Sequence, residues 1–180
     1  MQLTAAVMPT RSTTAANRAS LAFTSTTTTL PCQQAKLLNL SHTELADIIA
    51  SDVQERQCLY TAQYTPAIYD DDCQFKDGSN LDGTYPAEAW QRGCQFLFDS
   101  AASHCQLVPH TLRVTDRTVK FRFAETLTFN MPPIGGRQPR VSITGTVVLQ
   151  RHPVTGLIVS YEECWDQDVA EILRRTTFLG

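Results

Sequence analysis

After Ser103 the apolar residues recur at every second position, and this alternation limits the possible folds more than any other feature of the chain. Between residues 119 and 129 an apolar set and a polar set take turns. The apolar set is Val119, Phe121, Phe123, Leu127 and Phe129, and the polar set is Lys120, Arg122, Thr126 and Thr128. A period of two is typical of a strand with one buried face. The second half of the chain is therefore predicted to form a sheet with one packed side.

The same alternation occurs in three further segments, which are residues 108–114, 141–149 and 157–165. Turn-forming sequences separate the four segments, and they lie at Asp116-Arg117, residues 132–136 and residues 152–156. Glycine, proline and asparagine-type residues between alternating runs are typical of hairpin connections. We therefore predict four long strands that are linked by hairpins.

Helical signals dominate the part of the chain before Ser103. Ser41 and Glu44 have the spacing of a capping box, and an apolar stripe with helical spacing follows as far as Val53. A helical turn at 66–69, a strand at 73–77 and a helix from residue 84 or 85 to about residue 101 are predicted next. Helices that precede hairpin-linked strands predict an α+β fold, with one curved antiparallel sheet and helices packed on one of its faces.

The first 34 residues differ in composition from the rest of the chain. They contain no Asp or Glu, and they hold Arg11, Arg18 and nine threonines. An acid-free, hydroxyl-rich and weakly basic leader is typical of organelle transit peptides, and the many threonines favour a plastid over a mitochondrion. We predict a disordered plastid transit peptide at 1–34, a single domain at 35–180 and a location in the plastid stroma. The alternative is a disordered tail without a targeting role.

Composition and motifs argue against several classes of function. The formal net charge of −3 argues against a basic nucleic-acid-binding surface. No apolar run approaches the roughly 18 residues that span a bilayer, so no membrane partner is expected. The six cysteines form no Cys-x-x-Cys pair, the histidines form no His-x-x-x-His pair, and the chain has no glycine-rich phosphate loop. We therefore expect neither a metal nor a cofactor.

Three segments resemble one known family. Residues Ala67 to Asp77, with the sequence AIYDDDCQFKD, resemble the start of SnoaL-like domains of the nuclear-transport-factor-like superfamily. Gly83 with the helix after it, and residues Tyr161 to Asp166, are similar to the next and the closing elements of that family. The resemblance covers about residues 43–178, and it is greatest to uncharacterised plastid-targeted members found in plants and algae.

The resemblance implies a conical sheet whose concave face is packed with helices and encloses a pocket for a small organic ligand. It also implies proton-transfer chemistry without a cofactor, of the isomerase, cyclase or dehydratase type, and a homodimer formed through the sheet. The alternative is a non-catalytic domain that uses the same fold for homodimerisation or for binding another protein.

Asp77 is the first candidate catalytic residue. It matches the position at which steroid isomerases of the superfamily place their general base, and a desolvated carboxylate can take a proton from the carbon beside a carbonyl. The chain has Gly78 where the family pattern has proline. The alternative role for Asp77 is to accept hydrogen bonds from the turn at Gly78 and Ser79.

Glu125 is the second candidate, because it falls among the apolar residues of its strand. Burial of an unpaired carboxylate is unfavourable by several kcal/mol, so Glu125 needs a partner or a wet cavity. A hairpin through Asp116-Arg117 places His110 opposite Phe123, diagonally beside Glu125, and the two could serve as an acid and a base. The alternatives are a structural ion pair and a bulge that turns Glu125 outward.

The last strand supplies a third acidic candidate. Glu162 and Glu163 fall on opposite faces of the predicted strand, so one of them faces inward unless a bulge intervenes. Tyr69, Trp90 and Trp165 are further candidates for the pocket wall, although large aromatic side chains more often supply buried core area. The predicted site therefore has Asp77, Glu125 and His110 as catalytic candidates, and a wall that includes the listed aromatic residues and one of the two glutamates.

Overall fold

The structure of the protein, a computed structural model, describes residues 35–79, 83–132 and 138–179. The predicted leader at 1–34 and most of the predicted turn at 132–136 lie outside the described residues. No helix within the described ranges is long and apolar enough to cross a bilayer.

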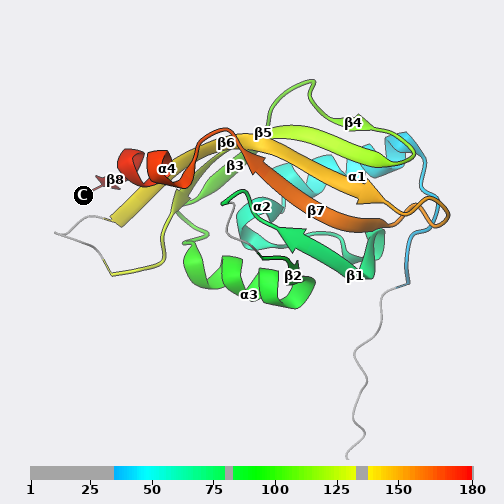
Figure 1. Ribbon diagram of the computed structural model, residues 1–180, viewed down its shortest axis with the longest axis horizontal. Coiled ribbons are helices and arrows are strands. Elements are labelled where there is room, and N and C mark those ends of the chain that lie inside the picture. The colour runs from blue at the N-terminus through cyan, green and yellow to red at the C-terminus, as the bar shows by residue number, and fades with distance from the viewer. Residues whose placement is uncertain (1–34, 80–82, 133–137, 180) are drawn as a thin grey trace, which may run out of the picture. The chain divides into compact units, whose positions relative to one another are not determined.

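The described strands form one sheet. The strands are β1 (Tyr69–Lys76), β2 (Tyr85–Pro86), β3 (His104–Leu107), β4 (Arg113–Val114), β5 (Thr118–Thr128), β6 (Gln138–Arg151), β7 (Ile158–Trp165) and β8 (Thr177–Leu179). Their order is β2-β1-β7-β6-β5-β3, and β4 pairs with β5 while β8 pairs with β6. Figure 1 shows the long strands β5, β6 and β7 side by side and curved.

The helices gather on the inner side of this sheet. They are α1 (His42–Gln54), α2 (Cys58–Thr61), α3 (Ala87–Leu97) and α4 (Val169–Arg175), with a 3-10 helix at Pro66–Ile68. In Figure 1, α1 lies behind the long strands, α2 appears between β7 and α3, and α3 lies below β1. The capping box of α1 forms as predicted, because the Glu44 carboxylate accepts from the Ser41 N–H at 2.9 Å and the Ser41 hydroxyl accepts from the Glu44 N–H. The predicted α+β fold with a curved sheet is confirmed.

One feature of the predicted sheet is wrong, because the sheet is mixed rather than wholly antiparallel. Strand β1 runs parallel to β7, with Phe75 opposite Tyr161 and Lys76 opposite Glu162. A short turn forces its two strands to run antiparallel, whereas parallel neighbours need a long connection. Strands β2 to β6 lie between β1 and β7 in the sequence. No short turn joins β1 to β7, so no local turn sequence determines the direction of β1 relative to β7.

The predicted strand at 108–114 is also wrong. The chain forms two short strands there, β3 and β4, and an exposed turn between them contains Pro109 and His110, the latter with a φ of 62°. Leu107, and not His110, lies opposite Phe123. Pro109 has no N–H to donate to a strand ladder, and the Arg122 N–H of β5 donates to the Thr111 hydroxyl at 3.1 Å. The turn therefore shifts the register that the simple hairpin predicts.

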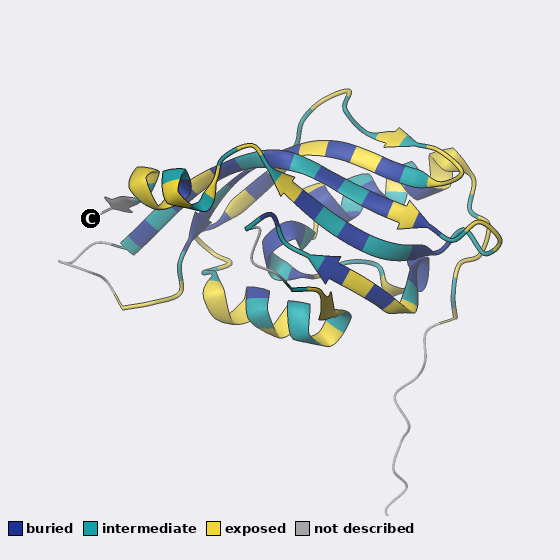
Figure 2. Ribbon diagram, viewed as in Figure 1, coloured by how far each residue is buried: buried dark blue, intermediate teal, exposed yellow. Residues whose placement is uncertain are grey.

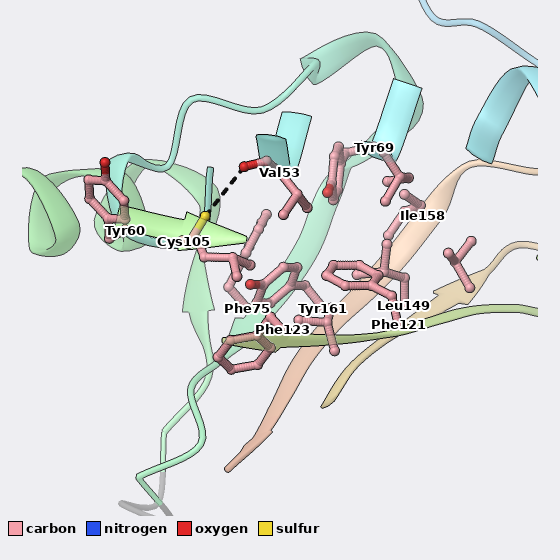
Figure 3. Packing of buried hydrophobic residues seen from close by; sticks show 14 of the residues in the cluster. Val53, Tyr60, Tyr69, Phe75, Cys105, Phe121, Phe123, Leu149, Ile158 and Tyr161 are labelled. Carbon is pink, nitrogen blue, oxygen red and sulfur yellow. Dashed lines mark hydrogen bonds between the residues drawn. The ribbon is translucent and has the colours of Figure 1, made fainter. Parts of the chain in front are cut away.

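The core lies between the inner sheet face and α1. Figure 2 shows the alternation of buried and more exposed residues along the long strands. In Figure 3, the rings of Phe75, Phe123 and Tyr161 come from three different strands, and Val53 of α1 lies across from them. The Phe75 and Tyr161 rings stack with centroids 5.2 Å apart. This aromatic packing joins β1 to β7 and borders the site described next.

Candidate functional site

A cavity of about 430 Å³ lies between the inner face of the sheet, α3 and α4. Most of its wall is apolar. The apolar lining residues are Leu59, Ala89, Trp90, Cys94, Leu97, Phe98, Leu127, Phe129, Val141, Ile143, Trp165, Val169, Ile172 and Leu173. The side chains that bring polar groups to this wall are Asp77, Ser79, Tyr85, Glu125 and Glu163. An apolar pocket with a few convergent polar groups is the usual form of a small-molecule site.

Strand alternation brings two glutamates to this wall. Glu125 lies on β5 between the inward-facing Phe123 and Leu127, and Glu163 lies on β7 between Tyr161 and Trp165. Each glutamate is only 6% exposed. Because β6 pairs with both strands, the same ladder that builds the core also points these two carboxyl groups to one side.

Glu163 accepts hydrogen bonds from its two neighbours on the same strand face. The Tyr161 hydroxyl donates to Oε1 at 2.5 Å, and the Trp165 indole N–H donates to Oε2 at 3.0 Å. Burial raises the pKa of Glu163 to about 7, the two hydrogen bonds oppose this rise, and the charge of Asp77 adds to it. Near neutral pH, Glu163 therefore exists in both its charged and its protonated form.

Glu125 differs from Glu163 because no described residue donates a hydrogen bond to its carboxyl group or forms a salt bridge with it. Burial raises the pKa of Glu125 well above its ordinary range, and the charge of Glu163 raises it further. The residue opposite Glu125 on β3 is Cys105, which offers no compensating charge. Glu125 therefore keeps its proton to higher pH than an ordinary carboxyl group, and in its protonated form it can donate a hydrogen bond or a proton into the cavity.

Asp77 lies in the cavity wall and also accepts hydrogen bonds from the turn that follows it. It lines the cavity, and its Oδ1 accepts from the Ser79 N–H at 2.9 Å and from the Ser79 hydroxyl. The turn packs closely on Trp165, because a Cβ at Gly78 would lie 2.2 Å from Trp165 Cδ1. Glycine at this position therefore lets the indole approach the backbone while it still donates to Glu163.

Five of the predicted site residues lie together and three lie elsewhere. Asp77, Trp90, Glu125, Glu163 and Trp165 all line the cavity. The predicted pairing of His110 with Glu125 is wrong, because His110 lies in the exposed turn before β4.

The other two residues outside the cavity are Tyr69 and Glu162. Tyr69 is buried in the core, with its ring centroid 4.8 Å from that of Tyr64. Glu162 points to the outer sheet face and forms a salt bridge with Lys76 at 3.0 Å. Of the two acids on the last strand, Glu163 is therefore the one that faces inward.

Sequence reasoning missed part of the wall. The α4 residues Ile172 and Leu173 line the cavity, although the sequence of their helix does not reveal that it packs on β6. The role of Tyr161 could have been found, because it shares a strand face with Glu163. Among the described residues, no group of three or more His, Cys, Asp or Glu side chains is arranged to hold a metal ion.

The two buried glutamates predict an unusual dependence of stability on pH. In the unfolded chain both titrate near the ordinary value of 4.5, and in the folded chain they keep their protons to higher pH. The folded state then binds more protons than the unfolded state, so the free energy of unfolding falls as the pH rises from 4.5 through 7. The expected slope is at most about 1.4 kcal/mol per pH unit for each carboxyl group.

Urea unfolding at several pH values between 5 and 8 measures this slope. Glu125→Gln and Glu163→Gln should each flatten it, whereas Glu162→Gln on the outer face should leave it unchanged. A wild-type stability that rises over this pH range would contradict the assignment of both buried acids.

Comparison with known proteins shows the fold. No protein-family model and no curated protein sequence matches the chain. Among solved structures, BvnE pinacolase from Penicillium brevicompactum has 11% sequence identity and a TM-score of 0.52, over 75% of this chain and 93% of that one. PrhC from Penicillium brasilianum has 16% identity and a TM-score of 0.51, over 70% and 83% of the two chains.

The description of a third solved structure identifies the fold. It is a Catenulispora acidiphila protein in complex with trimethylamine, and it is described as having a ketosteroid isomerase-like protein fold. Its identity is 11% and its TM-score 0.50, over 76% of this chain and 94% of that one. At these identities the likeness extends to the fold alone, so the chain has the ketosteroid isomerase-like fold that the superfamily resemblance predicts.

Proposed function

We propose that the chain binds a small organic molecule in the cavity and moves a proton to or from it without a cofactor. The observation that carries this proposal is the pair of buried carboxyl groups, Glu125 and Glu163, on the wall of an otherwise apolar cavity. Buried carboxyl groups are unfavourable for stability unless they are compensated, so their place in the cavity wall supports a role with a ligand.

The two glutamates have complementary roles in this proposal. Glu163, with a pKa near 7, is matched to accept a proton at neutral pH. Glu125, whose pKa burial raises well above its ordinary range, donates from its protonated form to negative charge that develops on the ligand as the proton leaves. Asp77, which the sequence suggested as the base, is held by Ser79 and acts on Glu163 through its charge. A base and an acid placed in this way can serve isomerisation, cyclisation or dehydration.

Hydrogen–deuterium exchange detects this chemistry before the natural substrate is known. The protein is incubated in D₂O with a panel of aromatic ketones small enough for the cavity, and ¹H NMR follows the loss of the C–H signal beside the carbonyl. We expect faster exchange of at least one ketone, and Glu163→Gln should lower that rate by at least about 100-fold.

The matched control is Glu162→Gln, which changes the next residue of the same strand on the outer face and should keep the full rate. Exchange that persists in Glu163→Gln would exclude Glu163 as the base. Exchange that is no faster with protein than without it, for every ketone, would count against proton transfer beside a carbonyl.

A homodimer formed through the outer sheet face is the second proposal. Uncharged residues, among them Thr146 and Val148 of β6, lie partly exposed in the middle of this face, and Figure 1 shows no helix in front of the long strands there. Val148 lies opposite Lys120 and Glu162, which are charged. This uncharged strip between charged residues favours self-association over binding to an anionic or cationic partner.

Sedimentation equilibrium of residues 35–180 tests the homodimer. We expect a dimer for the wild-type chain and a monomer for Val148→Glu, because the new carboxylate would lie beside Glu162 of its own chain and inside the interface. A wild-type chain that stays monomeric at high micromolar concentration would contradict the proposal. Val154→Glu, in the exposed turn before β7, is the control and should remain a dimer.

We also propose that residues 1–34 direct the protein to the plastid stroma, on the basis of their acid-free, threonine-rich composition. A fusion of residues 1–34 to a fluorescent protein should accumulate in the plastids of plant cells, and the full chain without these residues should not. Accumulation in mitochondria, or a diffuse signal from the fusion, would contradict the plastid assignment.

A further inference from the structure

We infer that the cavity selects organic ammonium ions: monocationic amines with apolar or aromatic substituents, whose positive charge lies beside Glu163 and Glu125. This inference rests on the proposed function, since it assumes that the cavity binds a small molecule. It adds the charge and the chemical class of that molecule.

The charge of the wall excludes anionic ligands. Asp77, Glu125 and Glu163 are the ionisable carboxyl groups of the lining, and the described lining contains no lysine, arginine or histidine. An anion in this cavity would lose its hydration and face Glu163 without any compensating cation. Carboxylates and phosphate esters are therefore unsuitable, and the choice is between neutral and cationic molecules.

The state of Glu125 favours a cation over a neutral ligand. Its side chain is buried, it lines the cavity, and none of the described residues hydrogen-bonds its carboxyl group. Burial raises the pKa of Glu163 to about 7, so this carboxyl group brings negative charge to the cavity wall as the pH rises through neutrality, and that charge raises the pKa of Glu125 further. A positive charge on a ligand balances the negative charge of Glu163, which a neutral ligand cannot do.

Aromatic rings on the wall provide a second source of selectivity. Trp90 and Tyr85 have ring centroids 6.4 Å apart, and Phe98 and Phe129 have centroids 5.6 Å apart, so each pair forms an aromatic segment of the lining. Aromatic faces attract ammonium groups, and this attraction increases when the cation is removed from water. Apolar walls with carboxyl groups but no basic group suit an alkyl- or arylammonium ion.

The two ends of the cavity determine how such a ligand lies. The carboxyl groups are at the buried end, whereas Leu97 and Leu173 are 46% and 68% exposed and line the same cavity from α3 and α4. The ammonium group therefore enters first, and the apolar substituents remain against the leucines at the opening.

Three probes of similar size test the inference by NMR titration of the ¹⁵N-labelled protein. Benzyltrimethylammonium is permanently cationic, neopentylbenzene is its neutral isostere, and phenylacetate is anionic. We expect the cation to bind at least roughly tenfold more tightly than the neutral isostere, and phenylacetate not to bind. Because the cation cannot titrate, its affinity should rise roughly tenfold from pH 6 to pH 8 as Glu163 loses its proton.

Variants separate charge from shape. Glu163→Gln should remove the preference for the cation and keep the binding of neopentylbenzene, which also reports that the variant is folded. Glu162→Gln should behave as the wild type. Equal or tighter binding of neopentylbenzene or phenylacetate to the wild type, or a cation affinity independent of pH, would overturn the ammonium inference and leave cavity binding intact. If none of the three probes shifts the resonances of cavity residues, the proposed ligand binding fails as well.

Discussion

The long antiparallel ladder between β5 and β6 is the constraint on which the rest of the structure depends. It runs without interruption from the pair Thr118 and Gln150 to the pair Thr128 and Arg140. A shift of one residue would turn every inward side chain outward, so the many apolar residues of the two strands allow only one register. Because this register is set by the core, the inward position of Glu125 follows from the packing of Phe123 and Leu127 on either side of it.

The site shows how a sheet can bury two glutamate side chains that have no basic partner among the described residues. Glu163 is compensated within its own strand, since Tyr161 and Trp165 point to the same face and each donates one hydrogen bond. Glu125 has no such donors among the described residues, and burial instead raises its pKa well above the ordinary range, which favours its protonated form. Two chemically identical side chains thus acquire different proton affinities from the residues two positions away.

The parts of the fold that depend on local patterns could be predicted from the sequence, and the parts that depend on distant contacts could not. The capping box of α1 and the alternation of β5 to β7 are properties of neighbouring residues. These local patterns therefore predicted the helix, the strands and the position of Glu125 among inward-facing residues. His110 was misplaced because a turn with a proline shifts the register, and alternation alone does not reveal an inserted turn. The parallel pairing of β1, the core position of Tyr69 and the contribution of α4 to the cavity wall arise from contacts between segments far apart in the chain.

Trp165, which packs closely on Gly78, also makes the tryptophan fluorescence of the protein sensitive to the cavity. The chain has two tryptophans, and both of them, Trp90 and Trp165, are on the cavity wall. The indole N–H of Trp165 also donates a hydrogen bond to the carboxyl group of Glu163, which titrates near neutral pH. The entire intrinsic tryptophan emission of this chain therefore originates at the cavity, so its wavelength and intensity are a built-in reporter of what occupies that space and of the protonation of its wall.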